Sequence, residues 1–82
     1  MKKILVIGST GQIGSELTKV LRETYGNENV VAGYIKGAEP KGWLAESGPM
    51  AEADVTNPQM IADIVKQYQI DTIYNLAALL SV

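Results

Sequence analysis

The stretch that decides the fold is Ile4-Leu5-Val6-Ile7-Gly8-Ser9-Thr10-Gly11-Gln12-Ile13-Gly14, close to the amino terminus. An apolar run of strand length ends at three glycines, and a helical pattern of apolar residues begins directly after them. Glycine allows backbone conformations that are closed to other residues, and it lets a phosphate approach the amides at a helix start. The stretch therefore predicts a strand, a tight phosphate-binding turn and a helix. The alternative is a glycine-rich turn that binds no ligand.

The Gly-x-x-Gly-x-x-Gly spacing gives each glycine an expected task. We expect Gly8 to form the tight turn, Gly11 to allow close approach of a pyrophosphate, and Gly14 to let the helix pack against the strand. Gln12 and Ile13 stand at the helix start, where their backbone amides would face the phosphate. All five residues are therefore candidates for cofactor binding.

The rest of the chain alternates between apolar runs and helical patterns. The expected strands are Lys3 to Ile7, Asn29 to Ile35, Met50 to Val55 and Thr72 to Ala77. The expected helices are Gln12 to about Tyr25, and Pro58 to Tyr68 or Gln69. In the first helix, apolar spacing predicts a buried stripe of Ile13, Leu17, Val20, Leu21 and Thr24.

Turn residues separate these elements. Gly26-Asn27 is a helix stop, and Thr56-Asn57-Pro58 is a helix start with a capping residue before a proline. The stretch from Lys36 to Pro49 is rich in glycine and proline, and we expect a loop with one short helical turn around Trp43 to Ser47.

Right-handed crossovers make the four expected strands parallel. The fold class is thus α/β: one domain over residues 1–82, half of a doubly wound Rossmann sheet with spatial order 3-2-1-4. The first strand is expected at the centre. The first, second and fourth strands are expected to be buried, and the third is expected to be weak because it is poor in β-branched residues. The fourth strand is left with an open edge, which favours self-association with a second chain.

Composition excludes several classes of function. The chain has no cysteine and no histidine, which removes disulfides, thiol nucleophiles, most zinc sites and histidine catalysis. A net charge of −2 without a basic run argues against nucleic acid or an anionic membrane as partner. The apolar run after Lys3 is too short for a signal peptide, and no segment is long enough to span a bilayer. We therefore expect a cytoplasmic protein.

The three-spaced glycine motif resembles that of the short-chain dehydrogenase/reductase superfamily, particularly its extended branch of epimerases and dehydratases. Within that branch, Gly11-Gln12-Ile13-Gly14-Ser15-Glu16-Leu17 and Asp71-Thr72-Ile73-Tyr74-Asn75-Leu76-Ala77-Ala78-Leu79-Leu80-Ser81 are similar to the NAD-dependent short-chain L-threonine dehydrogenases. The resemblance runs from Lys3 to Val82 and is poor between Lys36 and Gly48. It implies an NAD-binding amino-terminal segment.

The adenosine ribose is expected to meet an acidic residue about twenty positions after the last glycine. That count reaches Tyr34, where the resembling dehydrogenases usually carry aspartate. Without a carboxylate the repulsion of a 2′-phosphate is lost, and Lys36 is close enough to attract one or is only a solvated charge. Because no arginine or lysine stands inside the glycine turn, NAD is expected and NADP is less favoured.

The resemblance also implies contacts to the rest of the cofactor. Asp54 and Val55 correspond to the pair beside the adenine, although Asp54 is alternatively a helix-approach residue ahead of Thr56, the expected helix cap. The small-residue segment at the end of the fourth strand is expected to line the cofactor on its other side; its members are Leu76, Ala77 and Ala78.

Catalysis in the superfamily depends on a Tyr-x-x-x-Lys pair, and none of the four tyrosines here has lysine at the fourth following position. We therefore expect this chain alone not to transfer hydride, and we expect no catalytic residue and no metal ligand in it. One hypothesis is a cofactor-binding segment of an L-threonine 3-dehydrogenase or a related epimerase or dehydratase. The other is a noncatalytic, stand-alone nucleotide-binding or interaction module.

Overall fold

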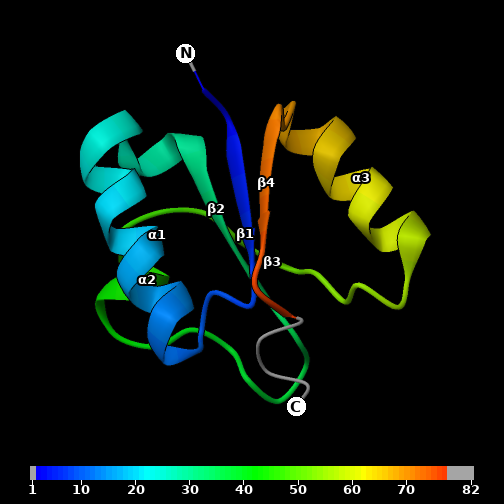
Figure 1. The fold of residues 1–82 in the computed structure, drawn as a ribbon, viewed down its shortest axis with the longest axis horizontal. Coiled ribbons are helices and arrows are strands. Elements are labelled where there is room, and N and C mark those ends of the chain that lie inside the picture. The colour runs from blue at the N-terminus through cyan, green and yellow to red at the C-terminus, as the bar shows by residue number, and fades with distance from the viewer. Residues whose placement is uncertain (1, 78–82) are drawn as a thin grey trace.

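The computed structural model describes residues 2–77 and contains a four-stranded parallel sheet with helices on both faces (Figure 1). In chain order the elements are β1 (Ile4–Ile7), α1 (Gln12–Tyr25), η1 (Asn27–Asn29), β2 (Val30–Tyr34), α2 (Trp43–Glu46), β3 (Met50–Glu52), α3 (Pro58–Tyr68) and β4 (Thr72–Asn75). The strand order is β3-β2-β1-β4. The predicted half of a doubly wound sheet is confirmed.

Strand β1 lies at the centre because it pairs in parallel with a strand on each side. Its first residue, Ile4, is in register with Val30 of β2 and with Thr72 of β4. All four residues of β1 are buried, as expected for an apolar strand covered on both faces. This strand carries the chain directly into the glycine turn.

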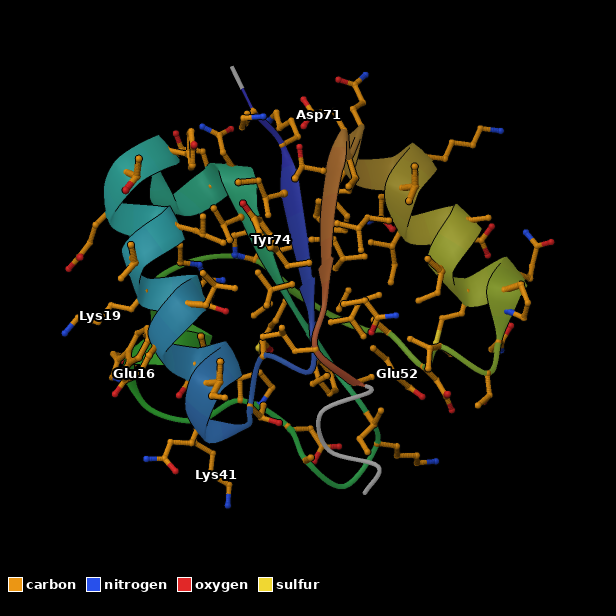
Figure 2. The ribbon with its side chains drawn as sticks, in the orientation of Figure 1. Glu16, Lys19, Lys41, Glu52, Asp71 and Tyr74 are labelled. Atoms are coloured by element: carbon orange, nitrogen blue, oxygen red, sulfur yellow. The ribbon has the colours of Figure 1, made fainter. Side chains whose placement is uncertain are left out.

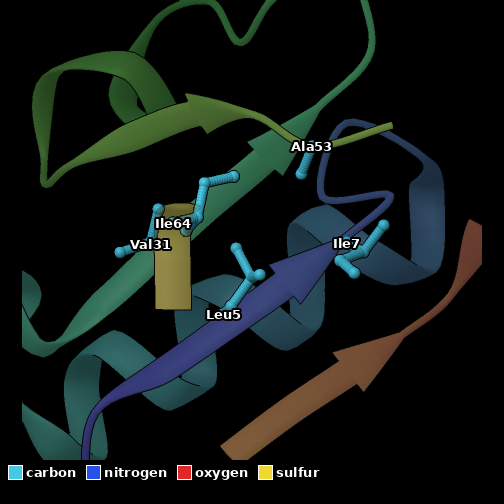
Figure 3. Packing of buried hydrophobic residues seen from close by; sticks show 5 residues of the cluster. All are labelled: Leu5, Ile7, Val31, Ala53 and Ile64. Atoms are coloured by element: carbon cyan, nitrogen blue, oxygen red, sulfur yellow. The ribbon is translucent and has the colours of Figure 1, made fainter. Parts of the chain in front are cut away.

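Apolar side chains form one cluster on each face of the sheet. On the α3 face the cluster consists of Leu5, Ile7, Val31, Ala53 and Ile64 (Figure 3). On the α1 face the buried residues are Ile4, Val6, Leu21 and Val30. Alternate residues of β1 thus point to opposite faces, and each face is closed by one helix.

Helix α1 begins and ends as predicted, but its predicted buried stripe is partly wrong. Ile13 is 64% exposed and Val20 is 55% exposed, whereas Gly14, Thr18 and Arg22 are buried together with Leu21. The reason is the close contact at Gly14, which fixes the rotation of α1 about its axis. The face at i, i+4, i+7 and i+8 from Gly14 then points to the sheet.

Arg22 is a buried cation that apolar periodicity did not indicate. Arg22 is 3% exposed, and its guanidinium donates to backbone and side-chain oxygens of the segment from β2 to β3. The acceptors are Val30 O (3.1 Å), Leu44 O (2.8 Å), Ser47 Oγ (2.9 Å) and Pro49 O (2.6 Å). Burial lowers the pKa of this guanidinium. Arg22 therefore ties α1 to the connection between β2 and β3.

Helix α3 begins at Pro58 as predicted, but the cap is Asn57 rather than Thr56. The Asn57 side chain accepts a hydrogen bond from the Met60 backbone N–H at 3.1 Å. Thr56 instead donates to Asp54. At the other end, Gln69 takes a left-handed conformation with φ of 56° and closes the helix.

Strand β4 was expected to be buried, and this expectation is wrong. Thr72 is half-buried, and the three residues after it are exposed, with Ile73 45% exposed and Tyr74 37% exposed. Strand β3 is also shorter than expected, ending at Glu52. Both strands lie at sheet edges, so each has a strand neighbour on one side only within the described residues.

Candidate functional site

The glycine turn joins the buried end of β1 to the start of α1. Gly8 has φ of 83°, a conformation that L side chains rarely adopt, and its carbonyl oxygen accepts from the Gly11 N–H at 3.3 Å. A Cβ on Gly14 would overlap that same carbonyl oxygen of Gly8. Two of the three glycines are therefore required by the geometry of the turn itself.

Gly11 differs from the other two glycines. It is the N-cap of α1 with φ of −72° and ψ of 169°, an extended conformation open to any residue. Its role as glycine is thus not demanded by backbone conformation. Gln12 and Ile13 follow it on the first turn of α1 and are exposed, so the helix start faces solvent.

The turn is also fixed to β2 through Gly33, a residue that sequence reasoning missed. The backbone N–H and the Oγ of Ser9 both donate to the Gly33 carbonyl oxygen, at 3.0 and 2.8 Å. A Cβ on Gly33 would lie 2.9 Å from the Val6 carbonyl oxygen and 3.0 Å from the Ala53 Cβ. A glycine inside an apolar strand signals such a close approach.

A cavity of about 270 Å³ opens at the carboxyl ends of the strands. It is lined by Ile7, Gly8, Thr10, Ile35, Ala38, Ala53, Asp54, Val55 and Ala77. In open α/β sheets, ligands bind outside the carboxyl ends of the strands, where the strand order reverses. We call this space the main cavity.

Several predicted site residues meet in the main cavity. Gly8, Asp54, Val55 and Ala77 line it, although they are far apart in the sequence. Leu76 is half-buried and packs against the apolar cluster on the α1 face. The prediction for Ala78 lies outside the described residues.

Asp54 is held by the residues that follow it. Its Oδ1 accepts from the Thr56 Oγ at 2.6 Å and from the Thr56 backbone N–H at 2.9 Å. These two hydrogen bonds, that of the side chain first, lower the pKa of the Asp54 carboxyl below its usual value. Asp54 is thus both a helix-approach residue and part of the cavity wall, so the two interpretations are compatible.

Tyr34 does not line the main cavity; Ile35 and Ala38 do. Tyr34 ends β2, is half-buried, and is in register with Glu52 of β3. The sequence did not predict Ile35 and Ala38 as cavity residues, because the chain turns sharply after β2 and returns to the cavity. The signal was Gly37, whose φ of 94° belongs to a turn in which Ala38 N–H donates to Ile35 O at 2.9 Å.

A second cavity of about 270 Å³ adjoins the main cavity at Thr10, which lines both. Its other lining residues are Ser15, Glu39, Pro40, Lys41, Trp43 and Leu44. Lys41 extends below the amino-terminal turn of α1 (Figure 2). We call this space the side cavity. In residues 2–77, no group of three acidic side chains is placed to hold a metal ion.

The parallel sheet of this order, with a glycine turn before α1 and a cavity at the carboxyl strand ends, defines a Rossmann-type α/β protein. More particularly, the chain belongs to the NAD dependent epimerase/dehydratase family, which it matches over residues 4–82. The part of the chain that the structure describes contains no helix long and apolar enough to cross a membrane.

Known sequences and solved structures are similar to this chain. An uncharacterized epimerase/dehydratase of Staphylococcus epidermidis is 43% identical over 81 residues, which cover 99% of this chain and 25% of that protein. The solved structure of L-threonine dehydrogenase from Clostridium difficile is 45% identical, with a TM-score of 0.77, over 92% of this chain and 23% of that one. A GalE-like L-threonine dehydrogenase from Cupriavidus necator, in its holo form, is 34% identical with a TM-score of 0.78, over 90% of this chain and 23% of that one. The chain thus spans about a quarter of the length of these relatives.

Proposed function

We propose that this chain is the NAD(H)-binding amino-terminal segment of an L-threonine 3-dehydrogenase-like oxidoreductase. The observation that carries the proposal is the main cavity, because it brings the glycine turn together with Asp54, Val55 and Ala77 at the carboxyl ends of the strands. The similarity to L-threonine dehydrogenases of known structure supports the same assignment.

The residues of the turn fit a pyrophosphate. Gly8 and Gly14 bring the turn close against α1, and the exposed helix start at Gln12 and Ile13 presents backbone N–H groups. The first amides of a helix have no partner within it, and the helix dipole favours an anion there. Gly11 has no Cβ to keep the phosphate away from these amides.

The main cavity fits the adenosine half of the cofactor. Its walls are mostly apolar, with Ile35, Ala53 and Val55 suited to the faces of a purine ring. Asp54 offers a carboxylate to an exocyclic amino group. The volume of about 270 Å³ is just below the range of about 300–1,000 Å³ typical of whole ligand pockets. A nucleoside, rather than an entire dinucleotide, matches this space.

When bound, a nicotinamide cofactor supplies a hydride acceptor or donor. The residues present here bind and orient that cofactor, and the 82 residues contain no Tyr-x-x-x-Lys pair to move a proton. Oxidation of L-threonine is therefore proposed for the protein of which this segment is part, and cofactor binding for the segment itself.

Isothermal titration calorimetry of the chain with NAD tests the proposal. We expect saturable binding, and we expect Gly11→Val to weaken it at least about tenfold because a side chain there blocks the amides. Gly11→Val keeps an allowed backbone conformation, and its lost capping costs only about 1 kcal/mol. Circular dichroism of the variant checks that it folds. No binding at millimolar NAD, or equal affinity of the folded variant, would contradict the proposal.

A second candidate is a noncatalytic nucleotide-binding or interaction module, which Tyr34 favours because it replaces the expected acidic residue. The two candidates differ in what the coding sequence contains. A reading frame that continues past Val82 into a Tyr-x-x-x-Lys motif would favour the dehydrogenase, and a stop codon there would favour the module.

A further inference from the structure

We propose that Glu39 supplies the ribose-binding carboxylate that position 34 lacks, and that it makes the site prefer NAD over NADP. This inference rests on the proposed function. NAD and NADP differ by one phosphate on the 2′-oxygen of the adenosine ribose. An acidic residue near that oxygen accepts a hydrogen bond from the 2′-hydroxyl of NAD and repels the phosphate of NADP. The end of β2 offers Tyr34 instead, which lines neither cavity.

The turn after β2 brings Glu39 to the glycine turn. Gly37, with φ of 94°, reverses the chain directly after Ile35, and the Ala38 N–H closes the turn on the Ile35 carbonyl. Ala38 then lines the main cavity and Glu39 lines the side cavity. The two cavities share Thr10, so Glu39 stands beside the space assigned to the nucleoside.

The Glu39 carboxylate is oriented and kept charged. Its Oε2 accepts from the Gly37 backbone N–H at 3.1 Å. That hydrogen bond is the main cause of a lowered pKa of the Glu39 carboxyl, and the charge of Lys41 adds to it. A carboxylate has about four acceptor positions, so one bonded to Gly37 can still accept a ribose hydroxyl.

Lys41 makes the proposed specificity measurable. It lines the same cavity as Glu39, and its ammonium would attract a phosphate. Neutralising Glu39 removes the repulsion of a 2′-phosphate and leaves that cation in place. The preference for NAD should then move towards NADP.

Another carboxylate near Tyr34 provides a matched control. Glu52 is in register with Tyr34 but is exposed and lines neither cavity (Figure 2). If a carboxylate near the end of β2 were enough, Glu52 would act as well as Glu39. The proposal instead requires the residue that the turn places beside Thr10.

The test is isothermal titration calorimetry with NAD and with NADP on three proteins: the unsubstituted chain, Glu39→Gln and Glu52→Gln. We expect the chain to bind NAD more tightly than NADP. Glu39→Gln should weaken NAD binding about tenfold, the effect of losing one hydrogen bond to a charged group, and bring the two affinities together. Glu52→Gln should change neither affinity. Circular dichroism verifies that both variants fold.

The outcomes separate this inference from the proposed function. NAD binding that Glu39→Gln leaves unchanged, or that Glu52→Gln weakens equally, overturns the role of Glu39 and leaves the proposed function standing. A chain that binds NADP as tightly as NAD also overturns the role of Glu39. If neither cofactor binds, the proposed function fails and the role of Glu39 fails with it.

Discussion

The two strands that flank β1 differ sharply. Strand β2 has strand neighbours on both sides, and four of its five residues are buried. Strand β4 pairs only with β1 among the described residues, and three of its four residues are exposed. Ile73 of β4 is apolar but 45% exposed, so its burial is limited by the position of β4 at the sheet edge rather than by residue type.

The same difference divides the candidate site. On the β2 side, the Ser9 hydrogen bonds to Gly33 and the Arg22 network fix the glycine turn and the chain after β2. On the β4 side, Ala77 reaches the main cavity behind a largely exposed strand. The side of the site that we propose for the adenosine is therefore the more firmly held half.

Gly14→Ala is expected to have the largest effect. Its Cβ would overlap the carbonyl oxygen of Gly8, and backbone cannot give way as a flexible side chain can. We expect a loss of about 3 kcal/mol or more in the free energy of unfolding, enough to unfold much of a domain this small. Urea unfolding followed by circular dichroism measures it.

Gly42→Ala is the control for that substitution. Gly42 has φ of 60°, but nothing lies within 4 Å of the position of its Cβ. Gly42→Ala should lower the free energy of unfolding by only about 1 kcal/mol, the cost of an unfavourable backbone conformation. Equal losses at the two positions would contradict close packing at Gly14.

Arg22→Met is expected to have the next largest effect. Methionine keeps much of the length of the side chain but leaves four buried or part-buried acceptors without their donor. We expect the free energy of unfolding, measured in urea, to fall by about 2–3 kcal/mol. Lys19→Met, on the exposed part of the same helix (Figure 2), should have a free energy of unfolding within about 0.5 kcal/mol of that of the unsubstituted chain. A smaller effect at Arg22 than at Lys19 would show that the network does not hold the β2 side.

Ile73→Lys tests the open side. We propose that the exposed edge of β4 supports pairing with a second copy of the chain, which a lysine on an edge strand opposes. Sedimentation velocity should show a concentration-dependent dimer whose dissociation constant rises about tenfold in the variant. Val20→Lys, at an exposed position of α1, should leave the dimer unchanged. A monomer at all concentrations would refute pairing through β4.

Asp71→Asn is expected to have the smallest effect. The Asp71 carboxylate accepts from the Thr72 Oγ at 2.8 Å and from the Lys3 backbone N–H at 3.3 Å, where β1 and β4 begin. The Thr72 hydroxyl is the main cause that lowers the pKa of Asp71. A lowered pKa means that the charged form stabilises the fold above the unfolded-state pKa, and that this gain is lost as pH falls through the folded-state pKa.

The chain should therefore be slightly more stable than Asp71→Asn at neutral pH, and the two stabilities should converge as pH falls below the usual aspartate range. Thermal unfolding at a series of pH values measures this. Asp63→Asn, on α3, is the control. A difference that grows as the solution becomes more acidic would have the wrong sign for this account.

The sequence predicted the elements well because local signals mark their ends. The glycine turn starts α1, Gly26 ends it, and Asn57 with Pro58 starts α3. The rotation of α1 was not predictable from apolar spacing, because it depends on the contact between Gly14 and Gly8. Burial of Arg22 likewise depends on carbonyls far along the chain.

The candidate site was partly predictable for the same reason. Gly8, Asp54, Val55 and Ala77 follow strand ends, and the carboxyl ends of parallel strands meet. Counting residues to Tyr34 found the end of β2 but not the cavity wall. The turn at Gly37 decides which side chains return to the cavity, and that turn is a tertiary arrangement rather than a spacing.

We propose that a dinucleotide binds at the carboxyl ends of the strands, around the glycine turn. Amide chemical shifts of the ¹⁵N-labelled chain during titration with NAD would locate the bound cofactor. We expect saturable shifts at the turn and helix start, at Gly8, Gly11 and Gln12, with Lys3 and Asp71 at the opposite end unchanged. Shifts confined to the opposite end, or none at millimolar NAD, would contradict it.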